Sequence, residues 1–276
     1  MYKKFLIVAS KEDKAGSNIT TALSQFRENP LLSGMNRDAK GFDFYLVDDS
    51  ILFEENLDMS RLEGYDFIIF ASQHKSEKGG KTLSIHAPGN FNEANYGGKN
   101  GRLSKTSALF QKHLFEKLHE KAKEFELDKY EITLEATHHG PFIHKPCLFV
   151  EIGSREEDWK DRRAAFVVAQ AIKSAIETFE VSEYREVAVG IGGPHYCPNF
   201  NKLQLKSNVA FSHIIPSYVL PLDKYMILEA IQKTDEEVDF VVLDWKGIGD
   251  DEARKQLIKV LEDNYISWKK RSEIRN

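Results

Sequence analysis

Asp66-Phe-Ile-Ile-Phe-Ala-Ser72 and Val238-Asp-Phe-Val-Val-Leu-Asp244 are the stretches that most clearly indicate the fold of this chain. Both are short, largely apolar and bounded by polar residues, which is typical of central strands covered on both faces. The strand that contains the second stretch is expected to extend over Val238–Trp245. The same pattern predicts further strands at Lys4–Ser10, Phe42–Val47, Glu131–Ala136, Cys147–Ile152, Glu186–Ile191 and Val209–Ile214.

Apolar residues at helical spacing fill several of the segments between these strands. They predict helices at Asn18–Phe26, Ser104–Glu126, Glu157–Phe179, Leu222–Lys233 and Asp250–Glu262. Ser154-Arg-Glu-Glu157 fits a capping box at the start of the third helix. The alternation predicts an α/β fold in which helices cover both faces of a mixed sheet. We expect a single domain over residues 1–276, with a long functional loop at residues 73–101.

The bulk composition excludes some classes of protein. Among its 276 residues the chain has no apolar run near the roughly 18 residues of a membrane span, and two cysteines are too few for a disulfide framework. A cytoplasmic protein without membrane contact is therefore expected. The formal net charge of −5 argues against indiscriminate binding to nucleic acid. Local basic segments nevertheless occur at Lys75, Lys78 and Lys81, at Lys99-Asn-Gly-Arg-Leu-Ser-Lys105, and at Lys269-Lys-Arg271.

Two histidine-bearing turns follow predicted strands. They are Glu135-Ala-Thr-His-His-Gly-Pro-Phe142 and Val189-Gly-Ile-Gly-Gly-Pro-His-Tyr-Cys-Pro-Asn-Phe200, and each places histidine beside Gly-Pro. Histidine can bind a metal or carry a proton near neutral pH, and open α/β folds bind ligands at the carboxyl ends of their strands. The two turns therefore predict one active site at this edge of the sheet.

The residue types near these turns suit zinc, which binds neutral imidazole, thiolate and carboxylate. The candidate ligands are His138, His139, Glu151, His195 and, in second place, Cys197. None of them has the spacing of a His-Glu-x-x-His metalloprotease. The alternative that these histidines only form hydrogen bonds with neighbouring loops therefore stays open.

A set of short motifs runs in order along most of the chain: Ser72-Gln-His-Lys-Ser76, Ser84-Ile-His-Ala-Pro-Gly-Asn90, Glu135-Ala-Thr-His-His-Gly-Pro141, Glu151-Ile-Gly-Ser154, Gly190-Ile-Gly-Gly-Pro-His-Tyr196, Ser212-His-Ile-Ile-Pro-Ser217 and Leu243-Asp-Trp-Lys-Gly247. Together they resemble the archaeal and plant type of D-aminoacyl-tRNA deacylase. The resemblance implies an enzyme that removes D-amino acids wrongly attached to tRNA, with a broad side-chain tolerance. It also implies zinc dependence, a monomer, and a fold of the phosphorylase/hydrolase-like α/β class.

Hydrolysis of an aminoacyl ester needs an activated water and a stabilised oxyanion, and zinc can supply both. His138, His139 and His195 are the first candidates for metal binding or general base catalysis, and Glu151 and His86 are the second. Single alanine substitutions at His138 or His195 are expected to lower turnover about a hundredfold or more.

Other residues are candidates for contacts with the substrate. The backbone N–H groups of Gly140, Gly192 and Gly193 are expected to bind the oxyanion or the terminal phosphate. The acceptor stem would be held through its phosphates, and Tyr196 or Phe200 would stack on the terminal adenine. The side chains expected to hold the tRNA are His74, Lys75, Lys78, Lys81, Lys99 and Arg102.

Two other classes of function remain open. A metallopeptidase or amidohydrolase of the same fold class would act on small peptides and would not need tRNA. A non-catalytic tRNA-binding module would use the histidines as structural residues only and would leave the bound tRNA unchanged.

Overall fold

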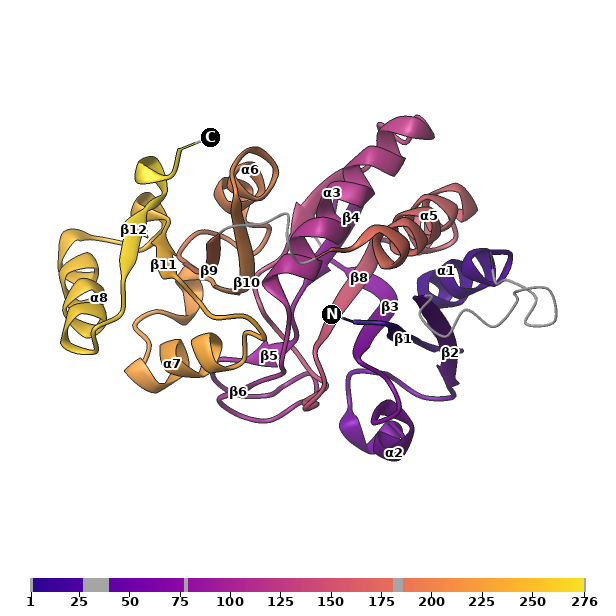
Figure 1. Ribbon diagram of the computed structural model, residues 1–276, viewed down its shortest axis with the longest axis horizontal. Coiled ribbons are helices and arrows are strands. Elements are labelled where there is room, and N and C mark those ends of the chain that lie inside the picture. Colours follow the sequence, from indigo (N-terminus) through magenta and orange to yellow (C-terminus); the bar gives the residue numbers. More distant parts are fainter. Residues whose placement is uncertain (1, 27–39, 77–78, 181–185, 276) are drawn as a thin grey trace.

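The computed structural model describes residues 2–26, 40–76, 79–180 and 186–275 (Figure 1). Its two main sheets have the strand orders β2-β1-β3-β8-β4-β7 and β10-β9-β11-β12. A short ladder of β5 (Gly89–Asn90) and β6 (Arg102–Leu103) lies beside α7 (Lys224–Gln232). The predicted α/β fold with a mixed sheet covered by helices is confirmed.

The six-stranded sheet combines two strand directions. β2 (Gly41–Val47), β1 (Lys4–Ser10), β3 (Phe67–Lys75) and β8 (Cys147–Ser154) run parallel to one another. β4 (Thr82–His86) is antiparallel to β8, and β7 (Glu131–Leu134) is parallel to β4. On β1, Phe5 and Ile7 face one hydrophobic cluster while Leu6 and Val8 face another, so both faces of this strand are buried.

Helices cover one face of this sheet and a shorter segment covers the other. α1 (Lys14–Ser24), α3 (Ala108–Glu124) and α5 (Arg162–Thr178) lie together on one side, and η1 (Glu54–Asn56) and α2 (Met59–Leu62) lie on the opposite side. Each of the three long helices begins where a side chain accepts hydrogen bonds from the first backbone N–H groups. The capping residues are Asp13, Ser107 and Asp161.

The four-stranded sheet is parallel throughout, with β9 (Glu186–Ile191) and β11 (Phe240–Leu243) at its centre and β10 (Val209–Ile215) and β12 (Trp268–Lys270) at its edges. Its other elements are α6 (Pro198–Lys206), α7, α8 (Asp251–Asp263), η3 (Ser217–Val219), η4 (Trp245–Gly247) and η5 (Arg271–Glu273). One hydrophobic cluster extends from Phe5 through Phe110 to Phe211 and Phe240, and so joins the two sheets. Within the described ranges, no helix has the length and apolarity needed to span a membrane.

The predicted helix Glu157–Phe179 is wrong in its start, because two helices occupy this stretch. α4 (Glu156–Trp159) ends first, and the Asp161 side chain then caps the first N–H groups of α5. The predicted capping box of Ser154 and Glu157 is also wrong. The carboxylate of Asp158 instead accepts hydrogen bonds from the N–H groups of Ser154 (3.0 Å) and Arg155 (3.1 Å).

Residues 73–101 do not form one long loop, which corrects that prediction. β3 continues to Lys75, and β4 lies inside the sheet between β8 and β7. The strand β4 alternates Thr82, Ser84 and His86 with Leu83 and Ile85, and all five side chains are buried. This position matters for function, since the polar side chains of β4 face the site described next.

Candidate active site

Three adjacent strands direct polar side chains to one face of the six-stranded sheet. Because side chains alternate along a strand, His74 on β3, Glu151 on β8 and His86 on β4 lie on the face opposite to α1 and α5. The register pairs Glu151 with Ser72 on one side and with Ser84 on the other. A buried carboxylate is thereby surrounded by histidine and serine side chains.

The turn after β7 supplies Glu135, His138 and His139. The N–H of Ala136 donates to the carbonyl of His195 (2.8 Å), which ties this turn to the loop after β9. The second histidine-bearing turn is therefore held directly against the first. We call the resulting group the His/Glu cluster, and its members are His74, His86, Glu135, His138, His139, Glu151 and His195.

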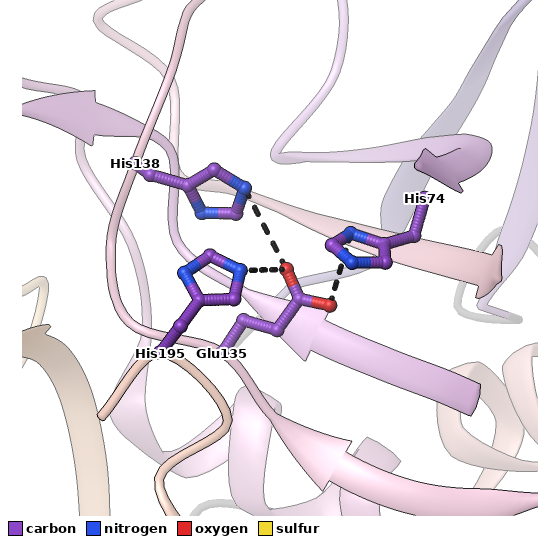
Figure 2. Close-up of side chains that lie close together, drawn as sticks. All are labelled: His74, Glu135, His138 and His195. Atoms are coloured by element: carbon purple, nitrogen blue, oxygen red, sulfur yellow. Dashed lines mark hydrogen bonds and ion pairs between the residues drawn. The ribbon is translucent and has the colours of Figure 1, made fainter. Parts of the chain in front are cut away.

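Glu135 is buried at the centre of three histidines (Figure 2). Its Oε2 lies 3.1 Å from Nε2 of His195 and 3.5 Å from Nε2 of His138. Its Oε1 lies 3.2 Å from Nδ1 of His74. One carboxylate thus connects side chains from β3, from the turn after β7 and from the loop after β9.

Glu151 forms the second centre of the cluster. It accepts a hydrogen bond from the Ser72 hydroxyl (2.6 Å), and its Oε2 lies 3.3 Å from Nδ1 of His74. Nε2 of His86 lies 3.7 Å from Oε2, and Nε2 of His139 lies 3.9 Å from Oε1. His74 therefore bridges the two carboxylates.

Contacts within the cluster set the protonation states of its two carboxylates and of His74. Burial alone would raise the pKa of Glu135, but the hydrogen bond from His195 and the charge of His74 hold that pKa below its usual range. Burial is likewise outweighed at Glu151, where His139, His74 and His86 hold the pKa well below its usual range. The two carboxylates overcome the burial of His74 and raise its pKa to about 10. Near neutral pH both carboxylates are ionised and His74 is positively charged.

His138 differs, because burial and then the neighbouring His86 and His139 lower its pKa well below the usual value. Nδ1 of His138 donates to the carbonyl of Ala136 (2.8 Å). Nδ1 of His139 donates in the same way to Gly140 (2.7 Å), and Nδ1 of His86 lies 3.2 Å from the carbonyl of Ala87. Each of these rings is therefore held through Nδ1 and directs Nε2 at the carboxylates, which is the arrangement of metal-binding histidines.

Two buried atoms of the cluster have no partner of hydrogen-bond geometry within the described ranges. They are Nε2 of His86 and Oε1 of Glu135. Unsatisfied buried polar atoms are costly, and a bound cation would satisfy both. Three overlapping sets have atoms close enough to share an ion: His74 with Glu135, His138 and His195; His86 with His138 and His139; and His86 with Glu135 and Glu151. The cluster therefore fits a metal ion.

The structure brings together most of the predicted catalytic and metal-binding residues, namely His86, His138, His139, Glu151 and His195. It also places His74, which the sequence suggested as a contact to tRNA, inside the cluster. Glu135 was absent from the predicted site. Its position directly before Ala-Thr-His-His, where a strand ends, is the signal that could have identified it.

The three glycines predicted to bind an oxyanion have no N–H group free for it. The N–H of Gly140 donates to Tyr96 (3.0 Å), that of Gly192 to Ile215 (2.8 Å), and that of Gly193 to Gly247 (3.3 Å). Gly192 and Gly193 instead have positive φ angles of 104° and 83°, which only glycine adopts readily. Their role is to turn the chain so that His195 reaches Glu135.

Two further predictions about the loop after β9 are corrected. Phe200 is 0% exposed and packs against Phe211 at a ring distance of 5.0 Å, so it cannot stack on a base. Cys197 is buried, and burial raises the pKa of its thiol well above the usual value. Its Sγ faces the carbonyl of His195 (3.2 Å), and it belongs to none of the metal-binding sets. Tyr196 does reach the site, since its hydroxyl lies 3.0 Å from Nε2 of His74.

The predicted basic residues have different surroundings. Lys81 forms an ion pair with the buried Asp158, whose carboxylate accepts a hydrogen bond from the last residue of β8. Arg102 is paired with Glu229 (2.9 Å), and its guanidinium lies 5.1 Å from the ring centre of Phe142. Lys99 lies 4.9 Å from the same ring, while Lys75 is exposed at the end of β3. Lys78 lies outside the described residues.

A family model for D-aminoacyl-tRNA deacylase matches residues 62–269. The chain belongs to the D-aminoacyl-tRNA deacylase family. The D-aminoacyl-tRNA deacylase of Thermococcus onnurineus is 38% identical over 256 residues, which cover 88% of this chain and 91% of that protein. That of Methanocaldococcus jannaschii is 30% identical over 275 residues, with coverage of 97% and 99%.

A solved crystal structure described as a conserved protein of unknown function has the same fold, with a TM-score of 0.85 and 30% identity. The superposition covers 99% of this chain and 98% of that chain. The resemblance to the deacylase family seen in the sequence motifs is confirmed. Every residue of the His/Glu cluster lies within the range that the family model matches.

His213 supports the turn that carries the paired histidines, and it makes stability depend on pH. Its Nδ1 lies 3.1 Å from the hydroxyl of Thr137, and burial lowers its pKa to about 3. Between pH 6.5 and 3, His213 is therefore protonated in the unfolded chain and neutral in the folded chain. The stability present above pH 6.5 should fall by up to about 1.4 kcal/mol per pH unit as the solution is acidified.

Urea unfolding between pH 7 and 4 measures this effect in the His213→Gln variant. The variant should lose stability less steeply than the wild-type protein over this range. A His144→Gln variant, changed at an exposed histidine, is the matched control and should follow the wild type. Equal slopes for His213→Gln and wild type would contradict the assignment of the acid sensitivity to His213.

Proposed function

We propose that this chain hydrolyses the ester bond of D-aminoacyl-tRNA and releases free D-amino acid and tRNA, over a broad range of amino acids. The observation that carries the proposal is the His/Glu cluster, in which two buried ionised carboxylates orient five histidines from distant parts of the chain. Membership of the deacylase family supports the choice of substrate. We further propose that a single domain does this as a monomer in the cytoplasm.

Zinc is the cofactor that the donor set favours, because neutral imidazoles and carboxylates are its usual ligands. His86, His138 and His139 would hold it through Nε2, with Glu135 and Glu151 beside them. When bound, zinc would polarise the ester carbonyl and lower the pKa of a water molecule. The backbone carbonyls that accept from Nδ1 of these rings fix their orientation for this role.

His195 is suited to move the proton. Its side chain is 30% exposed, and that of His138 is 25% exposed, whereas that of His86 is fully buried. Because Nε2–H of His195 donates to Glu135 (3.1 Å), Nδ1 is the ring atom that can take up a proton. We infer that Nδ1 accepts a proton from the attacking water and returns it to the ribose oxygen as the ester bond breaks. The water oxygen stays on the carbonyl carbon, which yields the free amino acid.

Phosphates of the acceptor strand would meet a basic group beside the cluster. Lys99, Arg102 and Lys233 surround Phe142, at 4.9, 5.1 and 5.3 Å from its ring centre. Phe142 follows the histidine turn directly, and Gly98 packs against Gly140, so these cations lie close to the cluster. Since Arg102 is paired with Glu229, Lys99 and Lys233 are the two cations of this group that would attract an anionic ligand.

Replacing both Lys99 and Lys233 with alanine should weaken tRNA binding and also make it less dependent on salt. Each lost phosphate contact should lower the slope of log affinity against log salt by about 1. Binding isotherms at several salt concentrations measure the slope. A Lys255→Ala variant, changed at an exposed lysine of α8, should keep the wild-type slope, and an unchanged slope in the double variant would exclude these phosphate contacts.

Deacylation assays with matched D-Tyr-tRNA and L-Tyr-tRNA test the function, each with and without a zinc chelator. We expect release from the D-form only, lost with the chelator and restored by zinc. D-selective release that continues in the presence of the chelator would support the reaction and exclude zinc from its mechanism. Binding without release would favour a non-catalytic tRNA-binding module, and hydrolysis of small peptides without tRNA would favour a metallopeptidase or amidohydrolase.

A further inference from the structure

Tyr218 is an exposed aromatic residue beside the His/Glu cluster. Its hydroxyl lies 3.3 Å from Nδ1 of His195, yet the residue is 61% exposed. It belongs to η3, directly after β10 and Pro216. The ring is thus fixed to the site at its hydroxyl end, while most of its surface is open to solvent.

Backbone hydrogen bonds hold the segment that carries Tyr218. The N–H of Ser217 donates to the carbonyl of Gly193 (2.9 Å), and the N–H of Gly192 donates to the carbonyl of Ile215 (2.8 Å). The segment that carries Tyr218 and the turn that carries His195 are therefore one hydrogen-bonded unit. A rigid aromatic ring loses little conformational entropy when a flat ligand stacks on it.

None of the other exposed aromatic residues of the described chain forms a side-chain hydrogen bond or ring contact with the cluster. They are Phe53, Tyr96, Tyr225 and Tyr265. Of the two residues expected to stack on the terminal adenine, Phe200 is fully buried, and Tyr196 directs its hydroxyl at His74 inside the site. Among the aromatic residues that the structure describes, Tyr218 alone combines an open ring with direct contact to a residue of the cluster.

We propose that the ring of Tyr218 is the platform on which the terminal adenine of the tRNA stacks. This inference rests on the proposed function, because it requires an ester whose alcohol is the terminal ribose. The adenine is attached to that ribose, and Nδ1 of His195 must reach the ribose oxygen. A tyrosine whose hydroxyl touches Nδ1 is therefore placed to hold the base of the same nucleotide on its ring. Stacking is tolerant of the rest of the sequence, as an enzyme for many tRNAs requires.

The test is a cycle of two changes, one in the protein and one in the RNA. Binding is measured for an unacylated acceptor-stem hairpin that ends in CCA and for one that ends in CC. The wild-type protein should bind the CCA hairpin about 10–100-fold more tightly, and Tyr218→Ala should bind the two hairpins almost equally. Tyr218→Phe keeps the ring and should retain the preference. Tyr265→Ala, changed at a 97% exposed tyrosine after α8, is the matched control and should also retain it.

Kinetics on D-Tyr-tRNA provide a second readout. Compared with Tyr218→Phe, Tyr218→Ala should raise KM by a similar factor and change kcat much less, since both variants lack the hydroxyl that touches His195 and the ring contacts a part of the substrate that does not react. A Tyr218→Ala protein that keeps its preference for CCA would overturn the proposal. So would a Tyr218→Phe protein that loses as much as Tyr218→Ala, because the hydroxyl would then be the functional group. Wild-type protein that shows the CCA preference but releases no D-tyrosine would refute the proposed function without refuting the stacking of the adenine on Tyr218.

Discussion

The Glu135→Gln variant should lose about 10²–10⁴-fold in kcat/KM on D-Tyr-tRNA, which is the range for loss of a group that orients acid–base catalysis. The amide has nearly the shape of the carboxylate but carries no negative charge. It therefore cannot hold the N–H groups of His195 and His74 in place. One of its two polar atoms is an NH2 donor, which would face a donor on a histidine ring. Steady-state kinetics under matched metal loading measure the loss.

A matched control separates this effect from a general loss of charge. Glu177→Gln changes a half-exposed glutamate on α5 whose ion-pair partner is Lys173, and it should keep wild-type kinetics. Thermal unfolding of both variants verifies that each is folded. Activity of a folded Glu135→Gln protein within a few-fold of the wild type would show that Glu135 does not organise the site.

The His138→Ala variant should lose both bound zinc and turnover, the latter about a hundredfold or more. Its ring offers an unprotonated Nε2 to the cluster, and the carbonyl of Ala136 fixes the ring through Nδ1. Removal of one imidazole leaves an incomplete set of ligands, so metal affinity should fall together with the rate. Elemental analysis after dialysis measures zinc per chain, and turnover is assayed on the same samples.

His144→Ala is the control for this experiment, because His144 is exposed and lies outside the cluster on the same segment of chain. It should retain zinc and activity. If His138→Ala binds as much zinc as the wild type and turns over at a near-normal rate, His138 is neither ligand nor base. Retained zinc with lost turnover would assign it to catalysis alone.

The sequence predicted the layered α/β fold well, because most strands are uniform apolar runs that polar residues or turns interrupt. β4 was missed for a physical reason. It has only two apolar residues, Leu83 and Ile85, it follows the glycines at 79 and 80, and its polar side chains are buried by the site rather than exposed to solvent. Local pattern rules assume that alternating polar residues face water, and here they do not.

The site was predicted in part. The histidine turns beside Gly-Pro and Glu151 do belong to the cluster, but the expected position at the carboxyl edge of one sheet is wrong. The two turns follow β7 and β9, which lie in different sheets, and β7 runs antiparallel to β8, so the cluster forms against one face of the six-stranded sheet. Glu135 was quoted in its motif but not counted among the site residues, because carboxylates are rarely buried. The roles of Gly192 and Gly193 were misjudged, since only the structure tells where an N–H group finds its acceptor.

The order of the cluster along the chain has a consequence for synthesis of the protein. His74, His86, Glu135, His138, His139 and Glu151 all precede the end of β8, whereas His195 follows β9 in the second sheet. A nascent chain therefore possesses the imidazoles proposed to hold zinc well before it acquires the one proposed to move the proton. We therefore expect any product that terminates between these two points to lack the proposed proton carrier and to be inactive.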